Sequence, residues 1–281
     1  MIKKIKISDL VPGMYVHDLN CGWLEHPFIR NRFLIKTEQE VQKIIQFGIR
    51  ELYIDTNRGF DVPEAPTLQA VHQHLENRMH EISSAKQGAP KEISVEDELP
   101  RAKKIYREAH QLVQTMLLDV RMGQQVALEK MLPVVSTITD SILRNPDAML
   151  SLLRIKQADH YTFQHSIAVS TLLAAFCSYL KLKRPIIEQV GIGGLLHDIG
   201  KMKVSLDILN KPGKLTEQEF DLMKKHVEFG RSILESTPGI FPISIDIIAQ
   251  HHERHDGSGY PLRLRGAEIS HYGQMASIAD V

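Results

Sequence analysis

The sequence has little cysteine and no net charge. Its two cysteines, Cys21 and Cys177, lie far apart and form no Cys-x-x-Cys pair. A disulfide framework or a thiolate zinc site is therefore disfavoured, and a reducing compartment fits best. Across the 281 residues, 34 Lys and Arg balance 34 Asp and Glu. Such a chain lacks the broad electrostatic attraction to nucleic-acid polymers or acidic membranes that a basic surface provides.

Long hydrophobic runs are also missing. The most apolar stretch, residues 167–180, is interrupted by Ser170, Thr171 and Ser178. It is shorter than the roughly 20 residues that a membrane-spanning helix needs. The first residues carry lysines but no apolar core typical of a signal peptide. The sequence therefore predicts a soluble, cytoplasmic protein.

Residues 1–60 have the pattern of a small α/β domain. Alternating apolar and polar residues predict strands at 4–7 and 51–55. A capping signal that starts at Thr37 predicts a helix ending near Gly48. We expect this part of the chain to be an accessory domain.

The character of the sequence changes after this domain. Residues 61–100 are rich in acidic side chains and include Gly88 and Pro90, which favours a solvated linker. In residues 101–281 apolar side chains recur at helical spacing, and a break or kink is expected at Pro133. The fold class that we predict is α+β overall, with an α/β domain followed by an all-α helical bundle.

The second half of the chain contains further helix signals. A proline in a first turn and a Thr-x-x-Glu capping box mark two of the starts. The expected helices cover residues 159–182, 185–198, 216–235, 244–252 and 274–281.

Histidine is the residue type in excess. The chain has 14 histidines, and eight of them lie at or after residue 160. A single histidine on an amphipathic helix is more often a surface or core residue than a ligand. Here, however, histidines and aspartates fall on five expected helices, which is how helical bundles build metal sites. The candidate ligands are His165, His197, Asp198, His226, His251, His252 and Asp280.

The size and composition of this set indicate the kind of metal site. Five histidines and two aspartates are too many for one tetrahedral zinc ion. They suit two adjacent metals that share a carboxylate. Mixed imidazole and carboxylate ligation favours iron, manganese or nickel and leaves zinc open, whereas magnesium prefers oxygen ligands.

Three motifs, in order, carry a resemblance to a known family. HDIGK stands at residues 197–201, KPGKL at 211–215 and HHERHDGSGYP at 251–261. Together they make residues 150–281 resemble the HD-GYP domain, a branch of the HD phosphohydrolases. The N-terminal 60 residues, with GMYV at 13–16 and HPF at 26–28, resemble the small domain that often precedes it.

The resemblance implies a phosphodiesterase that linearises cyclic di-GMP to pGpG, and in some members continues to GMP. By position, one metal would be held by His165, His197, Asp198 and Asp280. Asp198 would bridge to a second metal, completed by His226, His251 and His252. Two such cations would acidify a bridging water and stabilise the charge that develops on the phosphoryl oxygens.

The resemblance also implies roles for residues outside the ligand set. Lys201 would contact a substrate phosphate and belongs with Asp198 in the catalytic machinery. The signature loop would shape the site and offer a contact to partners such as diguanylate cyclase (GGDEF) proteins. Its defining residues are Gly257, Gly259, Tyr260 and Pro261.

The chain departs from the family pattern in two places. Members with a third metal carry a glutamate four residues before the first ligand histidine, and here that position is Tyr161, so we expect two metals. The family domain normally runs on through further helices with basic residues that contact the dinucleotide, whereas this sequence stops at Val281. We therefore expect a fragment or a shortened domain, with Asp280 on a terminal turn prone to fraying.

Two other functions stay open on the sequence alone. One is a non-catalytic module that senses cyclic di-GMP or docks a partner. The other is an HD hydrolase that acts on a different nucleotide. A homodimer also stays open, through pairing of the apolar face of the helix expected at residues 101–120.

Overall fold

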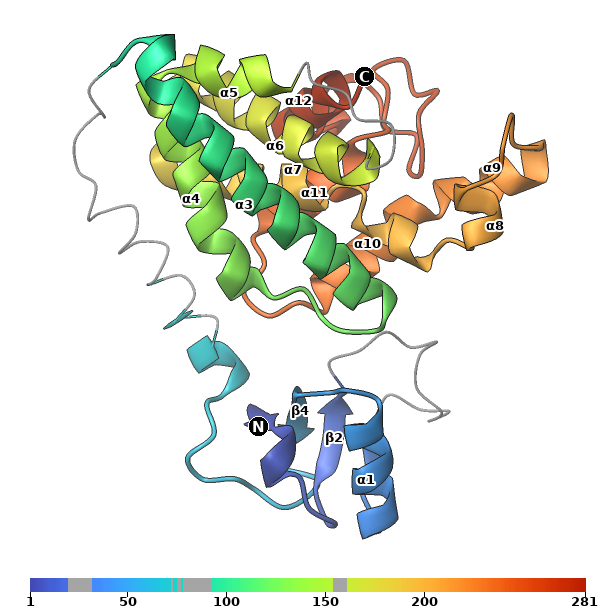
Figure 1. The fold of residues 1–281 in the computed structure, drawn as a ribbon. Helices are drawn as coiled ribbons and strands as arrows, with labels where there is room; N and C mark the ends of the chain where they lie inside the picture. The colour runs from blue at the N-terminus through green and yellow to red at the C-terminus, as the bar shows by residue number, and fades with distance from the viewer. Residues whose placement is uncertain (20–31, 72, 75–76, 78–91, 154–160) are drawn as a thin grey trace. The chain divides into compact units, whose positions relative to one another are not determined.

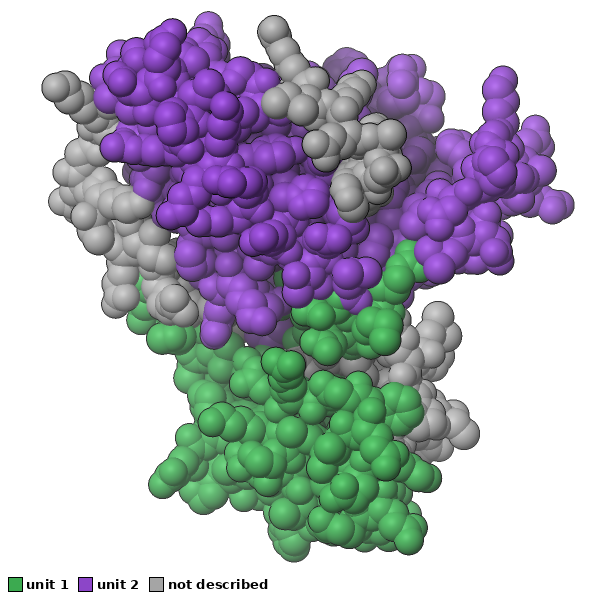
Figure 2. Space-filling view, viewed as in Figure 1, with its two compact units in different colours: residues 1–77, 119–126 green, residues 78–118, 127–281 purple. Residues whose placement is uncertain are grey.

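The computed structural model describes residues 1–19, 32–71, 73–74, 77, 92–153 and 161–281, with side chains omitted at 161 and 162. Contacts divide the chain into two compact units (Figure 2). The first comprises residues 1–77 with 119–126, and the second comprises residues 78–118 with 127–281. Cys21 and the HPF stretch at 26–28 lie outside the described residues.

The first unit is built on an antiparallel sheet with the strand order β1-β4-β2-β3. Its strands are β1 (Ile2–Lys6), β2 (Tyr15–Asp18), β3 (Phe33–Leu34) and β4 (Glu51–Asp55). Helix α1 (Glu38–Gln46) starts at Thr37, whose side chain forms the reciprocal capping box with Glu40. Alternating residues of the strands are buried together with residues of α1, so the sheet and the helix share one apolar core.

Parts of the segment expected as a linker take part in folded elements. In the first unit, the nearly buried ammonium of Lys3 pairs with Asp61 at 2.8 Å and donates to the carbonyl of Val62 at 3.0 Å. In the second unit, helix α3 (Val95–Arg121) begins before residue 101. Its fully buried Glu98 accepts hydrogen bonds from Ser141 and Arg144. The acidic residues at both ends of the segment are therefore used in packing.

The second unit is helical in the residues that the structure describes (Figure 1). After α3 come α4 (Leu128–Arg144), α5 (Pro146–Leu152), α6 (Tyr161–Tyr179), α7 (Arg184–Leu196), the 3-10 helix η3 (Ile199–Lys203), α8 (Leu206–Leu209), α9 (Glu217–Lys224), α10 (His226–Glu235), α11 (Pro242–Gln250), the 3-10 helix η4 (Gly266–Glu268) and α12 (His271–Ala279). Among the described helices, none has the length and apolar character to cross a membrane.

Two sequence-based expectations about helix boundaries were wrong. The break near Pro133 does not occur, because α4 runs through this proline and its apolar face stays buried. The chain turns instead at residues 122–127, where Gly123 has a φ of +88°. The single helix expected at residues 216–235 is two helices, α9 and α10, with Lys225 between them.

A buried charge network ties α4 to α7. Arg184 lies in the first turn of α7 and contacts Asp140 of α4 at 2.6 Å and Glu188 of its own helix at 2.9 Å. The guanidinium also donates to Ser136 Oγ at 2.9 Å. Pairing the buried charges in this way offsets the cost of removing them from water. The network fixes the position of α7, whose C-terminal end leads into the site described next.

Candidate metal centre

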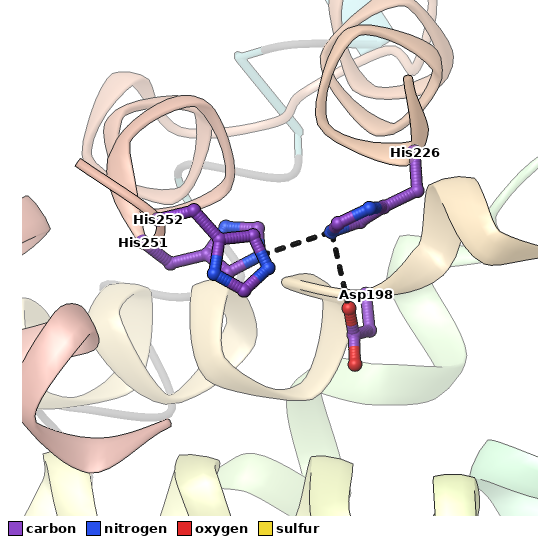
Figure 3. A group of neighbouring side chains, drawn as sticks. All are labelled: Asp198, His226, His251 and His252. Carbon is purple, nitrogen blue, oxygen red and sulfur yellow. Dashed lines mark hydrogen bonds and ion pairs between the residues drawn. The ribbon is translucent and has the colours of Figure 1, made fainter. Parts of the chain in front are cut away.

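The candidate ligands gather at the ends of several helices of the second unit. His165 lies on α6, His197 and Asp198 follow α7, and His226 begins α10. The His251-His252 pair follows α11, and Asp280 follows α12. Among the described residues they form two groups that could hold metal ions: Asp198, His226, His251 and His252, and His165, His197 and Asp280. Figure 3 shows the first group, with the imidazole of His226 facing Asp198.

Asp198 lies between the two groups and faces both of them. Its Oδ1 is 3.4 Å from Nε2 of His226 in the first group. Its Oδ2 is 3.2 Å from Nε2 of His197 and 3.9 Å from Nε2 of His165 in the second. Each carboxylate oxygen thus points to a different group, which is the arrangement that a bridging ligand requires.

The second group is closed by contacts between distant parts of the chain. Asp280 Oδ1 lies 2.7 Å from His165 Nε2 and 3.3 Å from His197 Nε2. The Nε2 atoms of the two histidines are 3.3 Å apart. Asp280 Oδ2 also lies 3.6 Å from His252 Nδ1. The carboxylate near the end of the chain is therefore held in place by three imidazoles.

The backbone orients three of the imidazoles in the same way. In His197, His226 and His251 the Nδ1 atom lies 2.8 Å from the carbonyl oxygen of the residue three positions earlier. A neutral imidazole that donates its Nδ1–H to this carbonyl leaves the lone pair of Nε2 for a metal. All three Nε2 atoms point into the site, so whenever these imidazoles are neutral the local helix geometry selects the tautomer that can bind a metal.

Two glycines allow the helices that carry the ligands to approach closely. A Cβ on Gly194 of α7 would lie 2.7 Å from Cα of Ser170 on α6. A Cβ on Gly200 of η3 would overlap the carbonyl oxygen of His226. Any side chain at these two positions would separate the backbones that bring His165, His197 and His226 together.

Burial and charge shift the pKa values of the ligands in opposite directions. Burial alone would lower the pKa of His197, but the carboxylates of Asp198 and Asp280 override it and raise the value to about 10. Burial would raise the pKa of Asp198, but His197 and Lys201 hold it well below its usual range. Together these shifts keep the carboxylates ionised as anionic ligands.

In the first group, by contrast, the pKa values of the imidazoles are lowered. Burial lowers the pKa of His226 and moves that of His251 well below its usual value. For His252, burial and then the neighbouring His226 lower the pKa to about 4. These imidazoles are therefore neutral near pH 7, which is the form that binds metals.

The donor set fits a divalent metal. Asp198 Oδ1 is buried and has no hydrogen-bond partner among the residues that the structure describes. A buried carboxylate oxygen without a partner is costly unless a cation compensates it. The converging Nε2 atoms supply the remaining ligands, so the residues present match the expectation of a metal centre.

Lys201 lies directly beside the bridging carboxylate. Its Nζ is 2.6 Å from Asp198 Oδ2, one helical turn along η3. The expected contact with a substrate phosphate stays a prediction. The side chain is only partly buried, and its ammonium already lies at the point where the two ligand groups meet.

The signature loop packs against a ligand. The ring of Tyr260 lies 4.7 Å from that of His252, tilted by 33°. The backbone N–H of Tyr260 donates to the carbonyl of His252 at 3.1 Å. A Cβ on Gly259 would overlap the backbone nitrogen of Arg254, so this position requires glycine. The signature loop thus packs directly against His252 and supports the position of its ring.

Sequence reasoning missed the residue that holds this loop. Glu253 is only 2% exposed, and its carboxylate accepts backbone N–H bonds from Leu262 at 2.6 Å, Arg263 at 3.1 Å and Leu264 at 3.0 Å. Arg263 has a φ of +56°, a left-handed conformation that is rare outside glycine. Adjacency to His252 was the one available signal, because a contact across ten residues of loop leaves no periodic pattern.

A cavity of about 1280 Å³ opens beside the centre. It is lined by the ligands His251, His252 and Asp280 and by much of the signature loop. The volume is above the roughly 300–1,000 Å³ of common small-molecule sites. The centre is therefore reachable by a substrate larger than a single phosphate.

Comparison with family models identifies the class of protein that this fold and site define. Residues 137–281 match the model of the HD domain, and residues 2–131 match a domain of unknown function, DUF3391. The chain belongs to the HD-domain family, with an N-terminal DUF3391 domain. The two His/Asp groups that could bind metals are typical of HD domains.

Several individual relatives are described as phosphodiesterases of cyclic dinucleotides. The chain is 36% identical to the cyclic di-GMP phosphodiesterase PA4108 of Pseudomonas aeruginosa, over all of this chain and 67% of that protein. It is 49% identical to the 3'3'-cGAMP-specific phosphodiesterase 2 of Vibrio cholerae, over 31% of this chain and 17% of the relative. A cyclic di-GMP phosphodiesterase of Thermotoga maritima is 37% identical over 43% of this chain and 33% of its own length.

A solved structure supports the fold. Bd1817, described as a HDG"Y"P protein from Bdellovibrio bacteriovorus, aligns with a TM-score of 0.53 at 19% identity. The alignment covers 100% of this chain and 86% of that chain. The expected family, with an N-terminal α/β domain followed by a helical HD domain, is confirmed by these comparisons.

Proposed function

We propose that the chain is a metal-dependent phosphodiesterase that hydrolyses cyclic di-GMP to pGpG, with or without further hydrolysis to GMP. The observation that carries the proposal is the position of Asp198, whose two oxygens each face a different group of imidazoles. Similarity over the whole chain to the cyclic di-GMP phosphodiesterase PA4108 supports the same reaction.

The residues of the two groups would hold the metals. His226, His251 and His252 would hold one metal, His165, His197 and Asp280 the other, and Asp198 would contact both. Metals bound there supply Lewis-acid activation of a phosphodiester and of the attacking water. Mixed nitrogen and oxygen ligation favours iron or manganese, with nickel or zinc as less favoured occupants.

Lys201 would act on the substrate rather than on the metals. Its ammonium lies 2.6 Å from the buried Asp198 Oδ2, and the Lys201 side chain itself is partly exposed. A phosphate oxygen that entered the centre would meet this donor, and a charge-assisted hydrogen bond would fix the phosphate and stabilise its developing charge. The cavity of about 1280 Å³ leaves room for the rest of a dinucleotide.

A second substrate is favoured by one comparison. The chain is 49% identical over 87 residues to the Vibrio cholerae phosphodiesterase described as specific for 3'3'-cGAMP. This dinucleotide has the same phosphodiester ring and replaces one guanine by adenine. Hydrolysis of 3'3'-cGAMP would use the same residues, so the relative kcat/KM of the two substrates decides between them.

The proposal is tested by turnover. Protein loaded anaerobically with Fe(II) or Mn(II) is incubated with cyclic di-GMP or 3'3'-cGAMP, and the products are separated by chromatography. We expect the wild type to form pGpG or GMP from cyclic di-GMP, or a linear dinucleotide with one guanine and one adenine from 3'3'-cGAMP, and His197→Ala to form neither. His271→Ala, which removes an exposed histidine of α12, is the matched control and should stay active. No product from wild-type protein that holds two metals would refute the proposal and favour a non-catalytic module.

A further inference from the structure

Helix α9 brings an aromatic side chain to the wall of the cavity beside the centre. Phe220 lines this cavity, although 48% of its surface is exposed. Its ring centroid lies 6.5 Å from that of Tyr260, in an edge-to-face arrangement. Tyr260 in turn packs against His252 at 4.7 Å. A row of rings therefore leads from a metal ligand to the exposed face of Phe220.

A lysine lies on the same wall. Lys224 also lines the cavity, and its Nζ is 5.2 Å from the ring centroid of Phe220 and 6.0 Å from that of Tyr260. The ammonium contacts Asp221 at 2.7 Å, and a third of the side chain is exposed. The wall thus combines exposed aromatic surface with a hydrogen-bond donor. Figure 1 shows α9 next to α8 at one edge of the helical unit.

This pair of groups has the chemistry that recognises a purine. An aromatic face stacks on a base, whatever the base is. A lysine donor discriminates between bases, because guanine offers two acceptors, O6 and N7, on the edge where adenine offers one acceptor and a donor. An exposed phenylalanine also occurs by chance on a protein surface. Its place on the cavity wall, with the lysine beside it, separates Phe220 from Leu222 of the same helix, which is 45% exposed but does not line the cavity.

We propose that Phe220 and Lys224 form a guanine subsite next to the metal centre. The guanine base stacks on the ring of Phe220, and the ammonium of Lys224 donates to O6 or N7. The subsite rests on the proposed function in one respect, namely that the guanine belongs to a dinucleotide whose phosphodiester lies at the metals. It would make the site selective for dinucleotides that contain guanine.

Binding of mononucleotides tests the subsite without turnover. The full chain, loaded with Mn(II), is titrated calorimetrically with GMP, AMP and inorganic phosphate. The wild type should bind GMP more tightly than AMP, and both more tightly than phosphate. In Phe220→Ala the affinity for GMP should fall about 5- to 150-fold, as expected for loss of one stacked base, while the affinity for phosphate is unchanged. Phe220→Trp should restore GMP binding, and Leu222→Ala should behave as wild type.

The lysine is tested separately by base preference. In Lys224→Met the ratio of GMP to AMP affinity should fall towards one. An unchanged ratio would overturn the role of Lys224, and unchanged GMP affinity in Phe220→Ala would overturn the subsite. A parallel loss of phosphate affinity in Phe220→Ala would also contradict it, because free phosphate has no base to stack. Failure of the proposed function gives a different result. In that case the protein binds GMP normally but forms no product from cyclic di-GMP.

Discussion

His165 Nε2 lies 2.7 Å from Asp280 Oδ1, although 115 positions separate the two residues in the chain. The contact joins α6 to the residue that follows α12 and completes the second ligand group. The side chain of Asp280 is mostly buried, and its carboxylate is ionised because neighbouring imidazoles lower its pKa against the effect of burial. A residue at the end of the described chain is therefore part of the candidate metal centre.

Asp280→Asn should remove one metal and spare the other. The amide keeps the size of the side chain but loses the charge that faces His165 and His197. Mutations of outer-shell partners cost about 10- to 100-fold in metal affinity, and we expect a direct ligand to cost at least as much. Metal content after dialysis measures the effect, with Asp207→Asn on the exposed α8 as the control. Two metals retained in Asp280→Asn would contradict the assignment.

Asp198→Ala should abolish binding at both groups. Its oxygens face His226 on one side and His197 on the other, so its loss removes a ligand from each metal. Circular dichroism should show an intact helical fold, because the backbone around η3 remains packed. Metal analysis and turnover provide the measurement. Residual activity near the wild-type level would rule out the bridging role.

The metal-free protein should lose stability as the pH falls from 6.5 towards 4. Burial lowers the pKa of His252 to about 4 in the folded chain, against about 6.5 in the unfolded chain. Between these values the unfolded state binds more protons, so the free energy of unfolding decreases with falling pH. His226 and His251 shift in the same direction. His197 has a pKa raised to about 10 and contributes the opposite trend, losing its stabilisation as pH rises from 6.5 to 10.

Denaturant unfolding of chelator-treated protein at pH 4.5, 5.5 and 6.5 measures this dependence. His252→Gln has no proton to gain in that range and should show a weaker dependence than wild type. Equal slopes in the two proteins would show that His252 titrates normally in the folded state.

Glu253→Gln should loosen the signature loop while leaving the metals bound. In Glu253, Oε1 accepts the backbone N–H bonds of Leu262 and Arg263, and Oε2 accepts that of Leu264. In glutamine an amide nitrogen replaces one of these oxygens and cannot accept an N–H bond. Leaving a buried donor unsatisfied costs about 1–3 kcal/mol. We expect a lower free energy of unfolding and a higher KM, with metal content unchanged. Wild-type stability and KM would contradict a positioning role for Glu253.

Features of the fold that depend on neighbouring residues were predicted well from the sequence. The capping boxes at Thr37 and Thr216 start helices as expected, because their contacts lie within four residues. The seven candidate ligands carry a dense signal in the motifs, and the structure brings them together in two groups that could hold metal ions. Local chemistry and spacing were sufficient for both.

Features that depend on tertiary packing were less accessible. The helix through Pro133 persists because a buried apolar face outweighs one lost hydrogen bond. Another expected helix breaks at Lys225, so that His226 is the first residue of α10. No proline or glycine marks this break in the sequence. The contacts of Glu253 with residues 262–264 are likewise set by the folded loop. These features follow from packing partners that are distant in the sequence.

The most direct test of the account is a titration of metal-free protein with Mn(II), in which bound metal and cyclic di-GMP hydrolysis are measured on the same samples. A centre of two groups that share Asp198 predicts a limit of two metals per chain, with activity rising only as the second is bound. Full activity with one metal per chain, or a third metal required for turnover, would contradict the account.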